Sequence, residues 1–178
     1  MALLLDALRR QARYNRWMNR KLYACASTLS DAQRRADRGA FFGSVHGTLN
    51  HLMLGDRLWL THWQRQGFGP MLPAQLQLAD DLPSLSLELY AHFDAMHHAR
   101  EALDALLIDW LAAADEALLR RDSTDTGPDG RRRTTPVWQE LQHLFNHQAH
   151  HRGQLTTLLT QAGLAFGSTD IIAMPPDA

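Results

Sequence analysis

The chain has 178 residues, of which 45% are hydrophobic and 21% charged, and its 18 basic and 19 acidic residues leave a net charge of −1 with histidine neutral. That length predicts a single domain over residues 1–178, and the balanced charge argues against nucleic acid or an anionic membrane as a partner. The one cysteine, Cys25, excludes an internal disulfide and a cysteine-rich zinc site. No apolar run reaches the about 20 residues of a membrane span, and charges come too early for a signal peptide. We therefore expect a soluble, cytoplasmic protein.

Apolar residues recur at helical spacing in four segments, which predicts helices over residues 3–29, 44–66, 84–109 and 136–162. In the third segment, Leu85 and Leu89 belong to the apolar face. Four amphipathic helices predict an all-α fold, a four-helix bundle. Bundles of this kind place metal and ligand sites in the core, between facing helices.

Local signals mark the helix ends and one turn. Ser44 and Thr135 are candidate N-caps, Pro136 suits the first position of the last helix, and Gly163 suits its C-terminal cap. Pro-Asp-Gly at residues 128–130 indicates a turn between arms rich in Thr and Arg. We expect a small hairpin there, directly before the last helix.

Four of the ten histidines of the chain lie in the last predicted helix. Helical phase places His151 about 20° and His147 about 60° from the core direction, on the same side. His143 and His150 fall beyond about 100°, toward the surface. Because His147 and His151 are four residues apart, their rings can converge on one atom. Hydrogen bonding within the core is the alternative.

The second helix offers a third histidine. His51 and His62 lie on one flank of its apolar stripe, and His46 lies on the other flank, turned mostly outward. Gly55, one turn after His51, leaves room for a ligand or solvent. Asp56 falls inside the apolar stripe, where a carboxylate needs a partner, either a metal-bound imidazole or an arginine.

Three other polar residues lie near these positions. Arg152 is expected to form an ion pair with an acidic residue, with Asp56 as one candidate. Asn15 and Gln11 face inward from the first helix, where they border the site or form hydrogen bonds within the core.

The runs FFGSVHGTLNHLMLGDRLWLTHW and LFNHQAHHRGQLTTLLTQAG resemble the DinB family, within the wider DinB/YfiT-like group of metalloenzymes. The opening YNRWMNRKLY and the closing STDIIA fit the same pattern. The resemblance implies a four-helix bundle with a three-histidine metal site, one ligand coming from LNHL and two from NHxxHHRGQ. In this chain those ligands are His51, His147 and His151. Helical phase alone favours His147 and His151 but leaves His51 and His62 open.

Three neutral imidazoles suit zinc or nickel, with iron, manganese or copper as alternatives, and three protein ligands leave a coordination position open. Characterised relatives in the wider group use low-molecular-weight thiols. The resemblance therefore implies a thiol S-transferase-like enzyme with a small-molecule substrate. We expect the substrate pocket to be lined by Trp59, Trp63 or other apolar side chains. A metal-dependent hydrolase is one alternative, and a non-catalytic metal-binding or stress-response protein is another. No further residue is assigned a catalytic role.

Two remaining features concern partners. The basic cluster Arg131–Arg133 is interpreted as a solvated part of the hairpin, so we expect no direct nucleic-acid binding. Met53, Leu54 and Leu58 make the second helix apolar on more than one side, which favours a homodimer.

Overall fold

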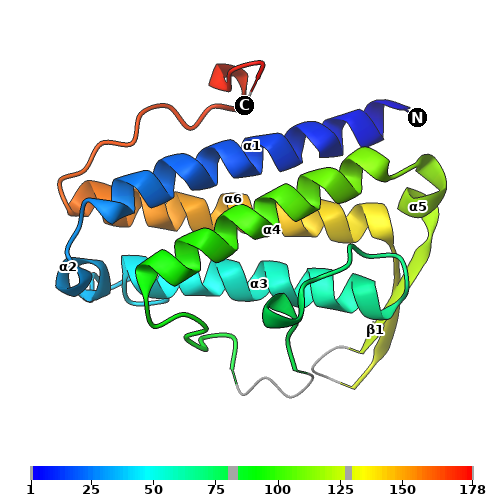
Figure 1. Ribbon diagram of the computed structural model, residues 1–178, viewed down its shortest axis with the longest axis horizontal. Helices are drawn as coiled ribbons and strands as arrows, with labels where there is room; N and C mark the ends of the chain where they lie inside the picture. The colour runs from blue at the N-terminus through cyan, green and yellow to red at the C-terminus, as the bar shows by residue number, and fades with distance from the viewer. Residues whose placement is uncertain (1, 80–83, 127–129, 178) are drawn as a thin grey trace.

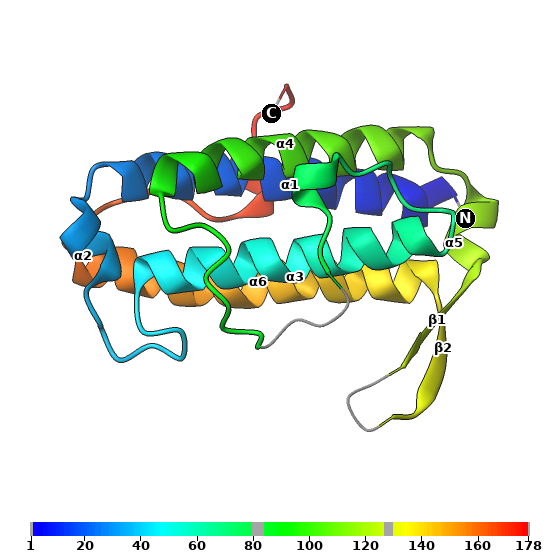
Figure 2. The same ribbon diagram turned by 60° about the horizontal axis from the view of Figure 1, so that its bottom comes forward.

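The computed structural model describes residues 2–79, 84–126 and 130–177. Four long helices lie side by side (Figures 1 and 2), namely α1 (Ala2–Ser27), α3 (Val45–Arg65), α4 (Phe93–Ala113) and α6 (Val137–Gln161). Helix α1 packs against α4 and α6, and α3 packs against the same two helices. The colour gradient in Figure 1 shows that α3 and α4 run in one direction and α1 and α6 in the other. The predicted all-α fold is confirmed.

Shorter elements connect the long helices. They are α2 (Asp31–Arg35), η1 (Ala74–Leu76), α5 (Glu116–Arg120), β1 (Asp122–Thr126), β2 (Arg132–Pro136) and η2 (Ile171–Ala173). The strands pair in antiparallel register, from Asp122 opposite Pro136 to Thr126 opposite Arg132, which confirms the expected hairpin. Residues 127–129 of its turn lie outside the described residues.

Most predicted helix ends agree with the structure to within two residues. The Ser44 side chain caps α3 by accepting from the Gly47 N–H at 3.0 Å. Gly163 adopts a φ of +79° just after α6, the left-handed conformation that glycine tolerates at a helix end. Thr135 is not the N-cap of α6, because it belongs to β2, and Pro136 occupies the cap position.

The third long helix begins at Phe93 and not at residue 84, so the prediction was wrong by nine residues there. Side chains of α3 hold the preceding segment in a non-helical course. The Asn50 side chain accepts from the Tyr90 N–H at 2.9 Å and donates to the Tyr90 carbonyl at 3.2 Å. Leu85, expected on an apolar helix face, is 61% exposed. Tertiary hydrogen bonds thus replace the ones a helix would have made.

The core is continuous along the bundle and draws leucine, methionine and aromatic side chains from all four long helices. Met53 and Leu54 of α3 are fully buried within this one chain, although they lie off the main apolar stripe. Because other parts of the same chain already cover these two side chains, they give no reason to expect a second copy. The homodimer stays a prediction. None of the described helices is long and apolar enough to cross a membrane.

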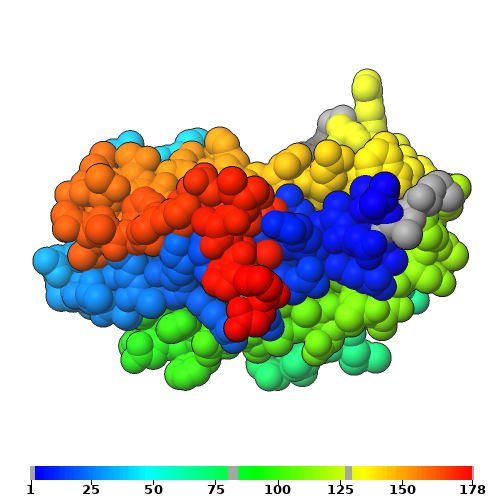
Figure 3. Space-filling model, turned by 90° about the horizontal axis from the view of Figure 1, so that it is seen from above, coloured from blue at the N-terminus to red at the C-terminus, as the bar shows by residue number. Residues whose placement is uncertain are grey.

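The segment after α6 folds back over α1 and α6, as Figure 3 shows. Tyr14 donates its hydroxyl hydrogen to the Thr169 carbonyl at 2.5 Å, and Lys21 donates to the Ser168 carbonyl. This segment therefore covers the side of the bundle that α1 would otherwise expose.

Candidate metal centre

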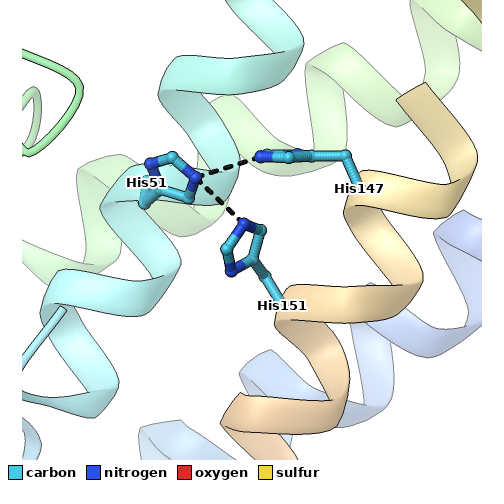
Figure 4. Close-up of side chains that lie close together, drawn as sticks. All are labelled: His51, His147 and His151. Atoms are coloured by element: carbon cyan, nitrogen blue, oxygen red, sulfur yellow. Dashed lines mark hydrogen bonds between the residues drawn. The ribbon is translucent and has the colours of Figure 1, made fainter. Parts of the chain in front are cut away.

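His51 of α3 and His147 and His151 of α6 point toward one another (Figure 4). Their Nε2 atoms are separated by 3.0 Å for His51 and His147 and by 3.2 Å for His51 and His151. The three residues form a group whose ligand atoms all lie within 4.8 Å of one another. The structure thus brings together the three histidines that the sequence pointed to.

Hydrogen bonds on the far side of two rings decide where their protons sit. His51 places Nδ1 at 2.9 Å from the Leu85 carbonyl, and His151 places Nδ1 at 2.8 Å from Gln154 Oε1. Because a carbonyl oxygen only accepts, Nδ1 carries the hydrogen in both rings and Nε2 keeps its lone pair. Two unprotonated nitrogens therefore face each other at 3.2 Å, an arrangement that a cation would stabilise.

These distances fit a transition metal. Metal–nitrogen bonds of about 2.0–2.1 Å in tetrahedral geometry separate the nitrogens by about 3.3 Å. The observed separations of 3.0 and 3.2 Å are close to that value. The outer hydrogen bonds from Nδ1 are also the kind that orient metal-bound imidazoles. The three histidines are positioned to hold a metal ion.

The electrostatics of the group favour neutral rings, the form that binds metal. Burial lowers the pKa of His51 and of His151. The pKa of His147 falls to about 3, first through burial and then through the neighbouring histidines, His151 and His51 foremost. All three rings are therefore neutral near pH 7 and ready to coordinate without losing a proton.

Gly55 leaves room for the His147 ring. A Cβ atom at this position would lie 2.8 Å from His147 Cε1 and 3.2 Å from His147 Nδ1. The space that the sequence left for a ligand or solvent is thus filled by the His147 ring. Glycine serves here to admit the ring and not for its backbone conformation, because a Cβ would displace the His147 side chain.

An aromatic wall closes one side of the group. The Phe42 ring stacks on His51 at 3.8 Å between centroids and meets His151 edge-on at 5.4 Å. Phe42 also lines a pocket of about 380 Å³, together with Arg35, Phe41, His46, Ser86 and Glu88 among others. The pocket and the histidine group thus both contact the Phe42 ring. A second connection runs through neighbouring residues, because Ser86 lines the pocket and the Leu85 carbonyl lies at His51 Nδ1.

Four other histidines do not take part in the convergence of the three Nε2 atoms, although the His150 ring lies 4.7 Å from the His151 ring between centroids. His150 and His143 are exposed, as predicted. His62 places Nε2 at 2.9 Å from Ser123 Oγ, which removes it as a rival of His51. The outward orientation expected for His46 was wrong, because this side chain is 1% exposed and places Nε2 at 2.9 Å from the Tyr90 carbonyl. The crossover before α4 covers it.

The structure also places the other singled-out polar residues. Asp56 forms an ion pair with Arg100 at 2.5 Å, so the arginine reading of this buried carboxylate is confirmed. Arg152 donates to Asn15 and Gln148, and within the described residues no acidic partner is found for it, contrary to expectation. Asn15 is fully buried and takes part in core hydrogen bonds.

The expected tryptophan pocket is not observed at Trp63. This side chain is fully buried, and its Nε1–H donates to Glu140 Oε2 at 2.7 Å. Trp59 is half-buried and meets the exposed His143 edge-on at 5.4 Å between centroids. The pocket that shares the Phe42 ring with the histidine group is lined by Phe41 and Phe42 among other residues.

Sequence reasoning assigned no role to Phe42, Gln154 or the Leu85 carbonyl. Gln154 could have been found, because it lies three residues after His151 on the same helix. Phe42 and Leu85 belong to segments without regular structure, where periodicity carries no signal.

Three histidines that converge from two facing helices place this chain among the helical bundles whose core can hold a metal ion. The family model described as "DinB family" matches residues 5–176, and the chain belongs to the DinB family. A curated relative, "Protein DinB" of Bacillus subtilis (strain 168), is 25% identical over 157 residues, which cover 88% of this chain and 87% of the relative. No solved structure matches the chain.

Proposed function

We propose that this protein is a metal-dependent enzyme in which His51, His147 and His151 hold one divalent transition metal, zinc or nickel being the best candidates, and which acts on a small-molecule thiol in the manner of a thiol S-transferase. The observation that carries the metal site is the pair of unprotonated Nε2 atoms of His51 and His151 facing each other at 3.2 Å. Hydrogen bonds alone do not explain this pair.

Three protein ligands favour catalysis over a purely structural role, because a fourth position stays open to substrate or water. A metal at this position lowers the pKa of a coordinated thiol or water. The protein supplies the rest: three neutral rings, two of them oriented by outer hydrogen bonds from Nδ1, and the Phe42 ring stacked on His51.

The pocket beside Phe42 supports a small-molecule substrate. Its volume of about 380 Å³ is in the range of ligand pockets, and aromatic side chains and the Arg35–Glu88 ion pair line it together. The thiol as reacting group rests on the family resemblance. Hydrolysis would use the same open position.

Metal content of purified variants tests the site. We expect about one metal ion per chain in the unchanged protein, and loss of most of it in His51→Ala, His147→Ala and His151→Ala. His150→Ala is the matched control, since it removes an exposed ring next to His151. Metal loss in His150→Ala and retention in His151→Ala would contradict the assignment.

Cobalt-substituted protein tests the chemistry. Small thiols are expected to produce a sulfur-to-cobalt charge-transfer band that is absent in His151→Ala and present in His150→Ala. A spectrum that responds to anions but to none of a series of thiols would favour a hydrolase. Turnover assays with a thiol and an electrophile then separate an enzyme from a non-catalytic metal-binding protein.

A further inference from the structure

Seven buried polar side chains connect all four long helices next to the three histidines. They are Asn15 and Asn19 of α1, Asp56 of α3, Arg100 and Asp104 of α4, and Gln148 and Arg152 of α6, each at most 4% exposed. We call them the core polar network. Its two carboxylates and two guanidinium groups balance in formal charge, and none of its members belongs to the histidine group.

Gln148 occupies the centre of the core polar network. Its Nε2 donates to Asp56 Oδ1 at 2.6 Å, and its Oε1 accepts from Arg152 at 3.3 Å. Asp56 is held in turn by the ion pair with Arg100 at 2.5 Å. The Gln148–Asp56 hydrogen bond therefore directly joins α6 to α3, the two helices that carry the candidate metal ligands.

This hydrogen bond lies directly beside the contact between Gly55 of α3 and the His147 ring of α6. Gln148 directly follows His147, and Asp56 directly follows Gly55, the glycine against which the His147 ring rests. Two consecutive residues of each helix therefore make both contacts, the one between Gly55 and the His147 ring and the Gln148–Asp56 hydrogen bond.

We propose that Gln148 and Asp56 are positioning residues that hold α6 against α3 at the separation at which the three imidazole nitrogens converge. The inference rests on the proposed metal site. A buried amide that uses both its ends and a buried carboxylate with two partners resist displacement, because any shift leaves polar atoms unsatisfied. Ligands on two separate helices need this restraint, since coordination tolerates errors of only about 0.5 Å.

Cobalt binding to Gln148→Leu tests the proposal. Leucine has a similar size but makes neither hydrogen bond, so we expect cobalt(II) affinity about 10-fold weaker or lower still and a changed visible absorption spectrum of the bound ion. If this variant does not fold, Gln148→Asn replaces it, because the shorter amide cannot reach both partners.

Glu140→Leu is the matched control. Glu140 is also buried and joins α6 to α3 through Trp63 at 2.7 Å, but it lies about two helical turns before His147. We expect a comparable fall in melting temperature for this variant, with the cobalt affinity and spectrum of the unchanged protein.

An exchange variant supplies the rescue. In the double variant Asp56→Asn with Gln148→Glu, the formal charge is conserved and the amide–carboxylate hydrogen bond between α3 and α6 is restored in the opposite direction. Cobalt affinity and spectrum should return toward those of the unchanged protein.

Three results would overturn the proposal: unchanged cobalt affinity and spectrum in the Gln148 variant, an equal loss in Glu140→Leu, or no recovery in the exchange variant. If the unchanged protein binds no cobalt at all, the proposed function fails as well. Cobalt binding that does not depend on Gln148 overturns the positioning role alone.

Discussion

At the residue scale, two helical glycines differ in whether the structure has space for a side chain. Gly55 of α3 faces the His147 ring at a distance that leaves no space for a Cβ, whereas nothing lies within 4 Å of the Cβ position at Gly153 of α6. Both are equally poor helix formers by themselves. The histidine group gives a reason for a glycine at position 55 but none for a glycine at position 153.

We therefore expect opposite effects from the same substitution. Gly55→Ala should displace the His147 ring and weaken metal affinity by about 10-fold or more, as loss of support for a ligand does. Gly153→Ala should keep the affinity and raise the free energy of unfolding by about 0.5–1 kcal/mol. Isothermal titration with zinc and urea unfolding measure the two quantities. Equal metal affinity in the two variants would contradict the role given to Gly55.

The pKa of His147 predicts how the metal-free protein responds to acid. Burial lowers this pKa from 6.5 to about 3, so between these values the unfolded chain binds a proton that the folded protein refuses. Stability associated with the neutral ring is complete above pH 6.5 and is lost as the pH falls toward 3. Urea unfolding of chelator-treated protein should show this decline, with a shallower slope in His147→Gln. An identical slope in both proteins would rule out His147 as a source of the effect.

At the scale of elements, the non-helical segment of residues 84–92, the end of the crossover between α3 and α4, contributes to the site. Its Leu85 carbonyl accepts from His51, and its Tyr90 backbone is held on both sides by Asn50. Asn50 directly precedes His51, so one turn of α3 both carries a candidate ligand and anchors the segment that orients it. The crossover also covers His46.

Asn50→Leu should release this segment. The partly buried Tyr90 N–H would lose its side-chain acceptor and the Tyr90 carbonyl one of its donors, which costs about 1–3 kcal/mol of unfolding free energy. Amide hydrogen exchange in the crossover, followed by mass spectrometry, should accelerate locally. Asn146→Leu is the control, because Asn146 precedes His147 in the same way but is exposed. Faster exchange in both variants, or in neither, would show that Asn50 does not anchor the crossover.

At the scale of the whole molecule, the core is formed by residues other than the histidine group. Apolar side chains of all four long helices form one cluster, and the core polar network links the same helices through hydrogen bonds and ion pairs. The histidine group joins only α3 and α6. A bound metal is thus expected to add stability to a protein that is already folded.

Metal removal should consequently leave the helical circular dichroism signal in place while lowering the melting temperature. Binding to the folded state alone adds about 2.7 kcal/mol at a free metal concentration 100 times the dissociation constant. The melting temperature should therefore rise with zinc concentration, and it should not do so in His151→Ala. Loss of helical signal on chelation would instead show that the metal is needed for folding.

The sequence by itself determined the features that depend on one helix at a time. The periodicity of apolar residues predicted the all-α fold. Helical phase favoured His147 and His151, because each residue has a fixed angular position around the helix axis. The caps at Ser44 and Gly163 were equally local. His51 came from the family resemblance, since phase had left His62 open.

The tertiary structure alone decided what lies opposite each face. It showed that Tyr90 covers His46, that Arg100 pairs with Asp56, and that the chain from residue 84 to 92 is not helical. The physical reason is the same in each case. These outcomes depend on hydrogen bonds between segments far apart in the sequence, and such bonds override the local preferences that a pattern of residues records.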